Sequence, residues 1–128
     1  MADSSVLIAA LIDAGPNGTW AEEILANGAL YAPELVQAEA TNVLRRLERA
    51  RLISTPEANA AQRDLMRLTI ELLPFEPFAE RIWELRHNMT SYDAWYVAIA
   101  EALALPLATL DRSLSRSTGI ACEVRTPR

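Results

Sequence analysis

Apolar residues recur along the chain in two kinds of stretch. Long stretches repeat them every three or four positions, which is typical of helices that bury one face. Short runs are continuously apolar, which is typical of parallel strands covered on both sides. Helices are predicted over residues 4–12, 19–27, 33–51, 55–68, 77–88 and 90–103. Strands are predicted to end near residue 3 and to cover 29–32, 70–73, 105–110 and 120–124. A polar turn or short helix at 113–117 and a frayed tail at 125–128 complete the chain. Alternating strands and helices predict an α/β sandwich with a parallel sheet.

Helix starts are marked by capping residues. Thr90, followed three positions later by Asp93, forms a capping box that opens one helix. Thr19, followed by Glu22, has the same spacing and predicts the start of the second helix. Pro33 is expected at the first position of the third helix, where its missing N–H is harmless. Because a helix N-terminus favours negative charge, Asp93 is expected to be ionised.

Three of the five Asp residues lie where strands end or helices begin. Asp3 follows the first predicted strand, and Ser4 or Ser5 is expected to cap the next helix. Asp111 follows the fourth predicted strand, and Asp93 lies in the first turn of its helix. Ligands of open α/β sheets bind outside the carboxyl ends of the strands, so these acids are candidate site residues. For Asp111 taken alone, a turn or capping role is an equal alternative.

Glu39 is a fourth acid, and it lies beside the apolar side of the predicted helix 33–51. It needs a partner, because acids are rarely buried unless they are paired or bound to metal. Asn42, three residues on, shares its face. The alternative is a boundary Glu that pairs with Arg46 or another Arg. Several carboxylates without a His or Cys cluster suit a hard divalent cation, and without one they repel each other or hold protons.

The composition narrows the class of protein. A length of 128 residues and 51% hydrophobic content fit one globular domain. No apolar run approaches the roughly 20 residues of a membrane span, and no basic export signal is present, so a cytoplasmic location is expected. The lone Cys122 excludes a disulfide framework and is expected to be a small buried hydrophobe, and the single His87 excludes His-rich zinc sites.

The net charge of the chain and its set of basic residues indicate different binding partners. A net charge of −5 argues against nonspecific DNA binding. All twelve basic residues are Arg, however, and the guanidinium group suits bidentate contacts with phosphate or carboxylate. Four of them lie together at 45–51 with Glu48 among them. This cluster is either a solvated helix face or an anion-binding surface.

Four motifs carry the acids in a fixed order. They are Asp-Ser-Ser-Val-Leu-Ile at 3–8, Pro-Glu-Leu-Val-Gln-Ala-Glu-Ala-Thr-Asn-Val-Leu-Arg-Arg at 33–46, Tyr-Asp-Ala-Trp-Tyr-Val-Ala-Ile-Ala-Glu at 92–101 and Leu-Ala-Thr-Leu-Asp-Arg-Ser-Leu at 107–114. Together they resemble PIN-domain ribonucleases, in particular the VapC toxins of toxin–antitoxin pairs. Each motif alone is weak, but the resemblance covers essentially the whole chain, so residues 1–128 are expected to form a single PIN domain.

The resemblance implies a three-layer α/β/α sandwich with a central parallel sheet of about five strands, and an endoribonuclease that depends on Mg²⁺, with Mn²⁺ as a substitute. The implied catalytic and metal-binding residues are the four acids Asp3, Glu39, Asp93 and Asp111. The implied supporting residues are Ser5, Asn42, Thr90 and Thr109. Water activated by the metal would attack an RNA phosphodiester in line and leave a 5′-phosphate and a 3′-hydroxyl. Three arginines that flank acids are candidates for binding RNA phosphates, namely Arg46, Arg112 and Arg116.

The resemblance also implies partners. The RNA is expected to be cut in loops, bulges or single strands, and tRNA, rRNA and mRNA all remain open. A cognate VapB-like antitoxin is expected to carry a basic segment that places an Arg near the acids. A homodimer through helix faces is expected, with Trp83, Trp95 and Tyr96 as candidate surface residues, and core packing is the alternative for at least one tryptophan.

Two other classes of protein stay open. A phosphoacceptor receiver domain also gathers Asp around Mg²⁺, but such domains have a lysine near the site, and this chain has no Lys. The second is a catalytically silent PIN-like module that binds RNA or an antitoxin, although the presence of all four acids argues against it. Family members usually carry more apolar residues before the first Asp. The first strand is therefore expected to be short, and a longer N-terminus is expected to raise the melting temperature.

Overall fold

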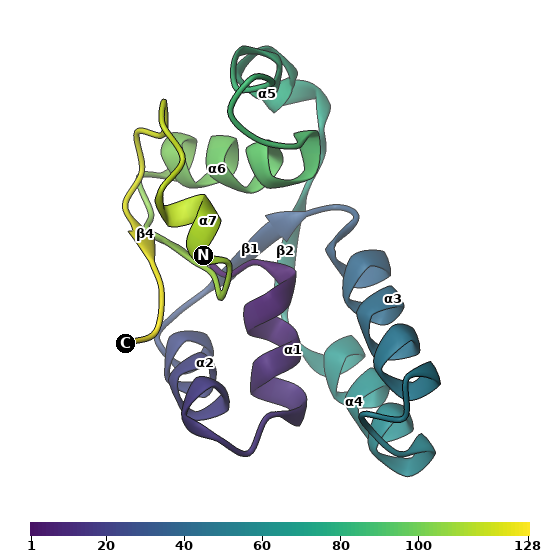
Figure 1. Cartoon of the computed structure of the whole chain (residues 1–128). Coiled ribbons are helices and arrows are strands. Elements are labelled where there is room, and N and C mark those ends of the chain that lie inside the picture. The colour runs from purple at the N-terminus through teal and green to yellow at the C-terminus, as the bar shows by residue number, and fades with distance from the viewer.

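The computed structural model describes all residues from 1 to 128. Its helices are α1 (Ser4–Ile12), α2 (Pro16–Ala26), α3 (Val36–Arg49), α4 (Thr55–Arg67), the 3₁₀ turn η1 (Glu76–Phe78), α5 (Ala79–Glu84), α6 (Ser91–Leu103) and α7 (Arg112–Ser115). Its strands are β1 (Leu30–Pro33), β2 (Ile70–Leu73), β3 (Leu107–Ala108) and β4 (Val124–Arg125). In Figure 1, α1 to α4 lie on one side of the strands, and α5 and α6 lie on the other. The predicted α/β architecture with parallel strands is confirmed.

The strands form two parallel pairs. In the first, β1 pairs with β2 from Leu30 opposite Ile70. In the second, β3 pairs with β4, and an isolated parallel bridge joins Ala2 to Ala108 on the other side of β3. The structure thus has four strands and one bridge, so the expected sheet of about five strands is not confirmed.

Side-chain hydroxyls explain why β3 is shorter than the predicted strand over 105–110. The amide of Leu110 donates to the Ser5 hydroxyl at 3.1 Å, and the amide of Asp111 donates to the Thr109 hydroxyl at 2.9 Å. These amides therefore have no ladder partner to bond. Pro106, just before the strand, has no N–H to contribute.

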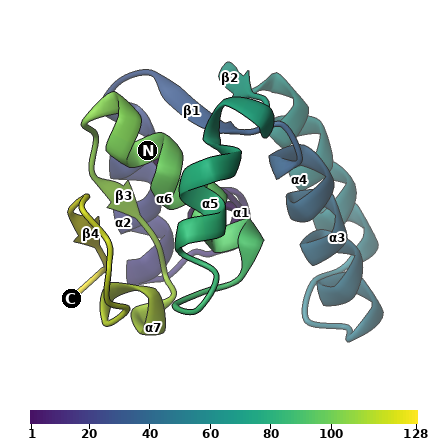
Figure 2. The same ribbon diagram turned by 90° about the horizontal axis from the view of Figure 1, so that it is seen from above.

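The core is centred on α6. Seven consecutive residues of this helix, 94–100, are buried, because other elements cover it on all sides. On the opposite side of the strands, α1 contacts α2, α3 and α4. Figure 2 shows α3 and α4 running alongside each other, to one side of α1. None of the helices is long and apolar enough to cross a lipid bilayer.

Several predicted helix starts are wrong by a few residues. The cap of α1 is Asp3 itself, which accepts from the Val6 amide, rather than Ser4 or Ser5. Helix α2 begins at Pro16, because proline at the first helical position has the right φ angle and needs no N–H partner. The start predicted at Thr19 therefore lies inside the helix.

The predicted start of α3 is wrong, whereas the predicted start of α4 is confirmed. Pro33 ends β1, and α3 begins only at Val36. Helix α4, in contrast, begins at Thr55 as predicted, because Ser54 and Glu57 form a reciprocal capping box. The strand predicted over 70–73 is confirmed as β2.

The C-terminal segment also differs from the prediction. The amide of Ala121 donates to Glu101 Oε2 at 2.7 Å, so the beginning of the strand predicted over 120–124 bonds a side chain instead of a neighbouring strand. Pairing with β3 begins only where the Leu107 amide donates to the carbonyl of Glu123. The tail predicted to fray is held, because Pro127 is buried and its carbonyl accepts from Arg112 at 2.7 Å. The predicted helix 77–88 is divided into η1 and the short α5.

Two of the three residues expected at a dimer surface lie in the core. Trp95 is 6% exposed and Tyr96 is 3% exposed, so the prediction is wrong for both. Trp83 is 67% exposed, and the Arg86 guanidinium lies 4.4 Å from the centre of its ring. Cys122 is half-buried and burial raises the pKa of its thiol, as expected for a structural rather than reactive cysteine.

Candidate active site

Asp3 is the most constrained of the four acids. Its Oδ1 accepts from the Ser5 hydroxyl and from the Val6 amide, and its Oδ2 accepts from the Thr109 hydroxyl. Burial raises the pKa of Asp3, and these hydrogen bonds oppose the increase. The carboxylate is therefore fixed at the start of α1, next to the end of β3.

Asp111 lies on the same edge of the sheet and caps α7. Its Oδ1 accepts from the Ser113 amide at 2.9 Å and from the Ser113 hydroxyl at 2.6 Å. These bonds lower the pKa of Asp111, which is exposed. The Thr109 hydroxyl links the two acids, because it donates to Asp3 and accepts the Asp111 amide.

Glu39 reaches the site from α3. It is half-buried, and its Oε1 accepts from the Tyr96 hydroxyl at 3.1 Å. The partner that a buried acid requires is thus a tyrosine on α6 rather than an Arg. Burial raises the pKa of Glu39, and the charges of Asp3 and Asp93 raise it further.

Asp93 lies in the first turn of α6. Its amide donates to the Thr90 hydroxyl at 3.2 Å, which confirms the predicted cap. Burial raises the pKa of Asp93, and the charges of Asp111 and Asp3 add to the increase. Burial and the neighbouring acids thus act against the ionised form of Asp93, and the expectation that the helix N-terminus keeps it ionised stays a prediction.

The four acids share one electrostatic environment. Asp3 raises the pKa of both Glu39 and Asp93, and Asp111 raises that of Asp93. Arg116, beside Asp111, is the one arginine whose charge lowers the pKa of any of the four. An uncompensated group of carboxylates is the donor chemistry that a hard divalent cation prefers. The spacing is more open than a coordination shell, because no three acid, His or Cys side chains lie close enough to hold one ion.

The supporting residues fall into two groups. Ser5, Thr90 and Thr109 hydrogen-bond an acid or the backbone that carries one. Asn42 bonds none of the acids, but it lies with Glu39 in the wall of a shallow depression of about 310 Å³. Asn42 and Glu39 therefore line the same depression, but they do not bond each other.

The three candidate phosphate-binding arginines are differently placed. Arg46 is exposed and lines the same depression as Glu39. Arg116 lies near enough to Asp111 to affect its pKa. Arg112 donates to the carbonyl of Pro127 and is thereby directed toward the C-terminal tail.

Sequence reasoning missed two residues that contact the acids. Tyr96 lies three positions after Asp93, so the spacing i, i+3 on one helix face would have indicated it. Ser113 lies two positions after Asp111, which is the spacing of an Asx turn. Both spacings are common in helices and turns, so neither identifies a site residue unless the fold is known.

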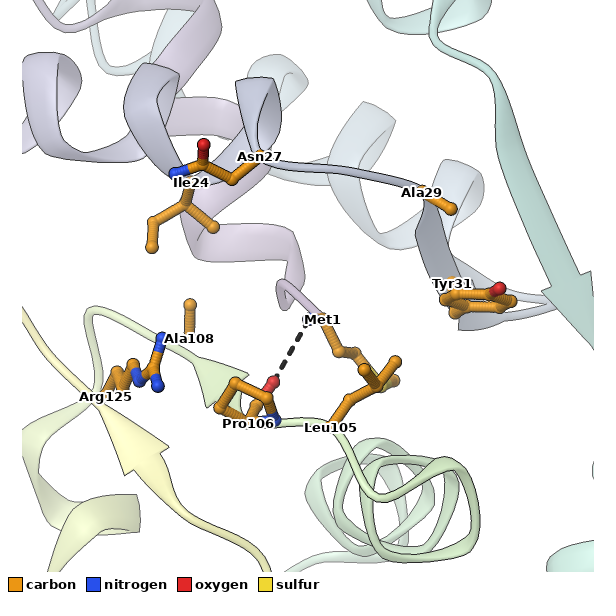
Figure 3. A pocket seen from close by; sticks show the side chains of 9 residues that line it. All are labelled: Met1, Ile24, Asn27, Ala29, Tyr31, Leu105, Pro106, Ala108 and Arg125. Carbon is orange, nitrogen blue, oxygen red and sulfur yellow. Dashed lines mark hydrogen bonds between the residues drawn. The ribbon is translucent and has the colours of Figure 1, made fainter.

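A second hollow, of about 340 Å³, lies away from the acids (Figure 3). It is mostly apolar, and Met1, Tyr31, Leu105 and Pro106 are among the residues that line it. The Met1 ammonium donates to the Pro106 carbonyl at 3.0 Å across it. No carboxylate lines this hollow, so it offers none of the chemistry expected of the acidic site.

Comparison with known proteins identifies the family of this chain. The family model described as PIN domain matches residues 1–119. Ribonuclease VapC1 of Mycobacterium tuberculosis is 37% identical over 127 residues, which cover 98% of this chain and 96% of that protein. Ribonuclease VapC9 of the same organism is 36% identical over 122 residues, which cover 95% and 93%. The crystal structure of PAE2754 from Pyrobaculum aerophilum matches with a TM-score of 0.65 at 27% identity, covering 95% of this chain and 86% of that one. The chain therefore belongs to the PIN-domain family, in which it groups with the VapC ribonucleases.

Proposed function

We propose that this protein is a metal-dependent endoribonuclease toxin of the VapC kind, and that residues 1–128 act as one PIN domain. Its catalytic and metal-binding residues are Asp3, Glu39, Asp93 and Asp111. One observation carries the proposal: acids from four separate segments lie close together, so that the charges of neighbouring acids raise the pKa of Glu39 and Asp93, and Arg116 is the one cation whose charge lowers the pKa of any of the four. The names of the relatives as ribonucleases support the same activity.

The proposed cofactor is Mg²⁺, with Mn²⁺ as a substitute. Both ions prefer oxygen ligands, and four carboxylates provide them. When bound, such an ion makes water easier to deprotonate and neutralises the charge that builds on the phosphate oxygens. Binding would also relieve the mutual repulsion that raises the pKa of Glu39 and Asp93.

The acids have different roles because their surroundings differ. Asp3 accepts three hydrogen bonds, so its carboxylate is held in place as a ligand for the metal ion. Glu39 has one oxygen bonded to Tyr96, and no hydrogen bond within the protein reaches the other. A carboxylate with a raised pKa and a free oxygen is suited to take a proton from the attacking water.

The groups around the four acids also indicate how the RNA substrate and the antitoxin would bind. Arg46 and Arg116, which lie beside acids, are the better placed arginines for RNA phosphates, while Arg112 is held by the tail. A VapB-like antitoxin would inhibit the enzyme if its basic segment placed an Arg among the uncompensated acids. We place this activity in the cytoplasm, where RNA is available.

We also propose a homodimer. Trp83 is the large exposed aromatic among the residues expected at such a surface, and aromatic residues are enriched at interfaces. Analytical ultracentrifugation at micromolar concentration should give the mass of two chains. A monomer under those conditions would contradict the dimer and leave the nuclease proposal unaffected.

Cleavage of labelled single-stranded RNA tests the nuclease proposal. The parent protein, Asp93→Asn and Asp64→Asn are compared with Mg²⁺, with Mn²⁺ and with EDTA. Asp64 is a matched control, because it is exposed on α4 and pairs only with Arg67, at 3.7 Å. The parent and the control should cut RNA when metal is present, and Asp93→Asn should be slower by about 100-fold or more, as for loss of one electrostatic group of an active site.

Two outcomes would count against this function. Equal cleavage by the parent and Asp93→Asn would remove the acids from the mechanism. RNA or antitoxin binding by a parent protein that does not cleave would instead favour the catalytically silent module.

A further inference from the structure

The depression of about 310 Å³ beside Glu39 is also lined by Tyr92, which has no role in the proposed cleavage reaction. Asn42, Val43 and Arg46 come from α3, Tyr92 comes from the first turn of α6, and Ser4 begins α1. Three helices distant in sequence thus meet around one hollow. Glu39 belongs to its wall, so the hollow adjoins the acidic site.

The hydrogen bond between Glu39 and Tyr96 fixes how the two walls face each other. Tyr92 lies one turn before Tyr96 on α6, and Arg46 lies two turns after Glu39 on α3. Tyr92 and Arg46 both line the depression, and the bond between Glu39 and Tyr96 connects the two helices that carry them.

The groups around the depression are available for a ligand. Tyr92 is 57% exposed, although it is a large aromatic residue. Arg46 is exposed and forms no ion pair or hydrogen bond within the protein. The Asn42 amide nitrogen likewise has no partner within the chain, since the one hydrogen bond of this side chain is accepted by its oxygen.

We propose that this depression binds one unpaired nucleotide of the RNA next to the scissile phosphate, with its base against Tyr92 and its phosphate on Arg46. This inference rests on the proposed function and adds to it a part for Tyr92 and Asn42 in holding the RNA. An aromatic face stacks on any unpaired base, and a guanidinium group binds phosphate. Asn42 is placed to hydrogen-bond the edge of the base.

Charge at Arg46 favours a nucleotide over a basic antitoxin segment as the occupant. Arg46 has no ion pair within the protein and would repel a basic segment, whereas a nucleotide presents an uncharged base to Tyr92 and a single phosphate charge to Arg46. A duplex cannot use the site, because its bases are already stacked and paired.

Binding of a fluorescent, unstructured RNA tests the subsite independently of cleavage. The measurements are made by anisotropy in the Asp93→Asn background, so that the RNA stays intact. Tyr92→Leu keeps an apolar side chain without an aromatic ring, and Tyr92→Phe keeps the ring. Tyr92→Leu should raise the Kd about tenfold, within the range that base stacking contributes, and Tyr92→Phe should stay within about twofold of the background protein.

The arginine is tested with a matched pair. Arg46→Ala should weaken RNA binding and reduce its salt dependence by about one phosphate contact. Arg63→Ala removes an exposed Arg on α4 that lines neither the site nor the depression, and it should change neither quantity. Duplex RNA should compete poorly with the labelled single strand.

The outcomes separate the subsite from the nuclease activity. If the parent does not cleave RNA but Tyr92→Leu still weakens binding, the subsite stands and the nuclease proposal fails. If the parent cleaves RNA and Tyr92→Leu leaves both the Kd and the KM unchanged, the subsite is overturned. Loss of antitoxin binding with unchanged RNA binding would also overturn it, since the occupant would then be a protein.

Discussion

The hydroxyl of Thr109 donates to the carboxylate of Asp3, a residue 106 positions earlier in the chain. The same hydroxyl accepts the amide of Asp111, so one side chain holds two acids of the site. It does so at 0% exposure, where a lost hydrogen bond cannot be replaced by water.

Thr109→Val keeps the shape of the side chain and removes this hydroxyl. The buried carboxylate of Asp3 then lacks one donor, so the free energy of unfolding should fall by about 1–3 kcal/mol. Urea denaturation measures this change. Thr41→Val is the control, because its hydroxyl bonds Gln62 on the surface, and it should cost less than about 0.5 kcal/mol. Similar losses in the two variants would mean that Thr109 has no special role.

Tyr96→Phe removes the hydrogen bond to Glu39. Because that bond lowers the pKa of Glu39, its loss should raise the pKa further above the ordinary value. The acidic limb of the pH–rate profile for RNA cleavage should then move to higher pH, and carbon NMR should report the same direction for the Glu39 carboxyl. Tyr31→Phe removes a hydroxyl in the wall of the apolar hollow, away from Glu39, and should leave both unchanged. If the pH–rate profile of Tyr96→Phe does not move, the ionisation of Glu39 does not control the rate of RNA cleavage.

The stability of the metal-free protein should decrease as the pH rises above about 4. The pKa values of Asp3, Glu39 and Asp93 lie above their ordinary values of 3.8 for Asp and 4.5 for Glu. Between the unfolded and folded pKa values, the folded state binds more protons, so raising the pH through this window removes stability. Above the window these acids are ionised, and Mg²⁺ should raise the melting temperature most strongly there.

Calorimetry across pH, with and without Mg²⁺, measures this effect. Asp93→Asn should flatten the pH dependence in the absence of metal and reduce the stabilisation by Mg²⁺. A melting temperature that increases steadily with pH in metal-free buffer would contradict the direction of the shifts.

Gly18→Ala should destabilise the packing of α2 against the end of α1. A Cβ atom at position 18 would lie 1.8 Å from the carbonyl oxygen of Asp13, so the backbone would have to move. Overpacking of this kind costs about 1–3 kcal/mol or more. Gly15→Ala is the control, because its Cβ would meet only a side-chain oxygen, at 3.1 Å. Thermal unfolding that ranks the two variants in the reverse order would count against this packing.

Local signals predicted those parts of the fold that local interactions build. The cap at Thr90 and the strand β2 were predictable, because a capping hydroxyl and a short apolar run act within a few residues. The four acids were predictable as a group from their motifs. Their partners were not, because Tyr96 meets Glu39 only after α6 has packed beside α3.

The end of β3 and the start of β4 were predicted wrongly for the same reason. The sequence pattern indicated a strand over 105–110, but the Ser5 and Thr109 hydroxyls bond the amides of Leu110 and Asp111, so the last bond to β4 is that of the Thr109 amide. Glu101 similarly bonds the amide of Ala121 and delays the start of β4. In each case a distant or polar side chain competes for a backbone group, and apolar periodicity carries no information about such competition.

The link between Asp3 and Thr109 has a consequence for protein synthesis. Because the first acid accepts a hydrogen bond from a residue 106 positions later, the site is incomplete until the chain has been made and folded through that residue. The amide of Thr109 in turn bonds the carbonyl of Arg125, which is made later still. A nascent chain that stops before β3 therefore lacks both Asp111 and one of the donors that hold Asp3 in place.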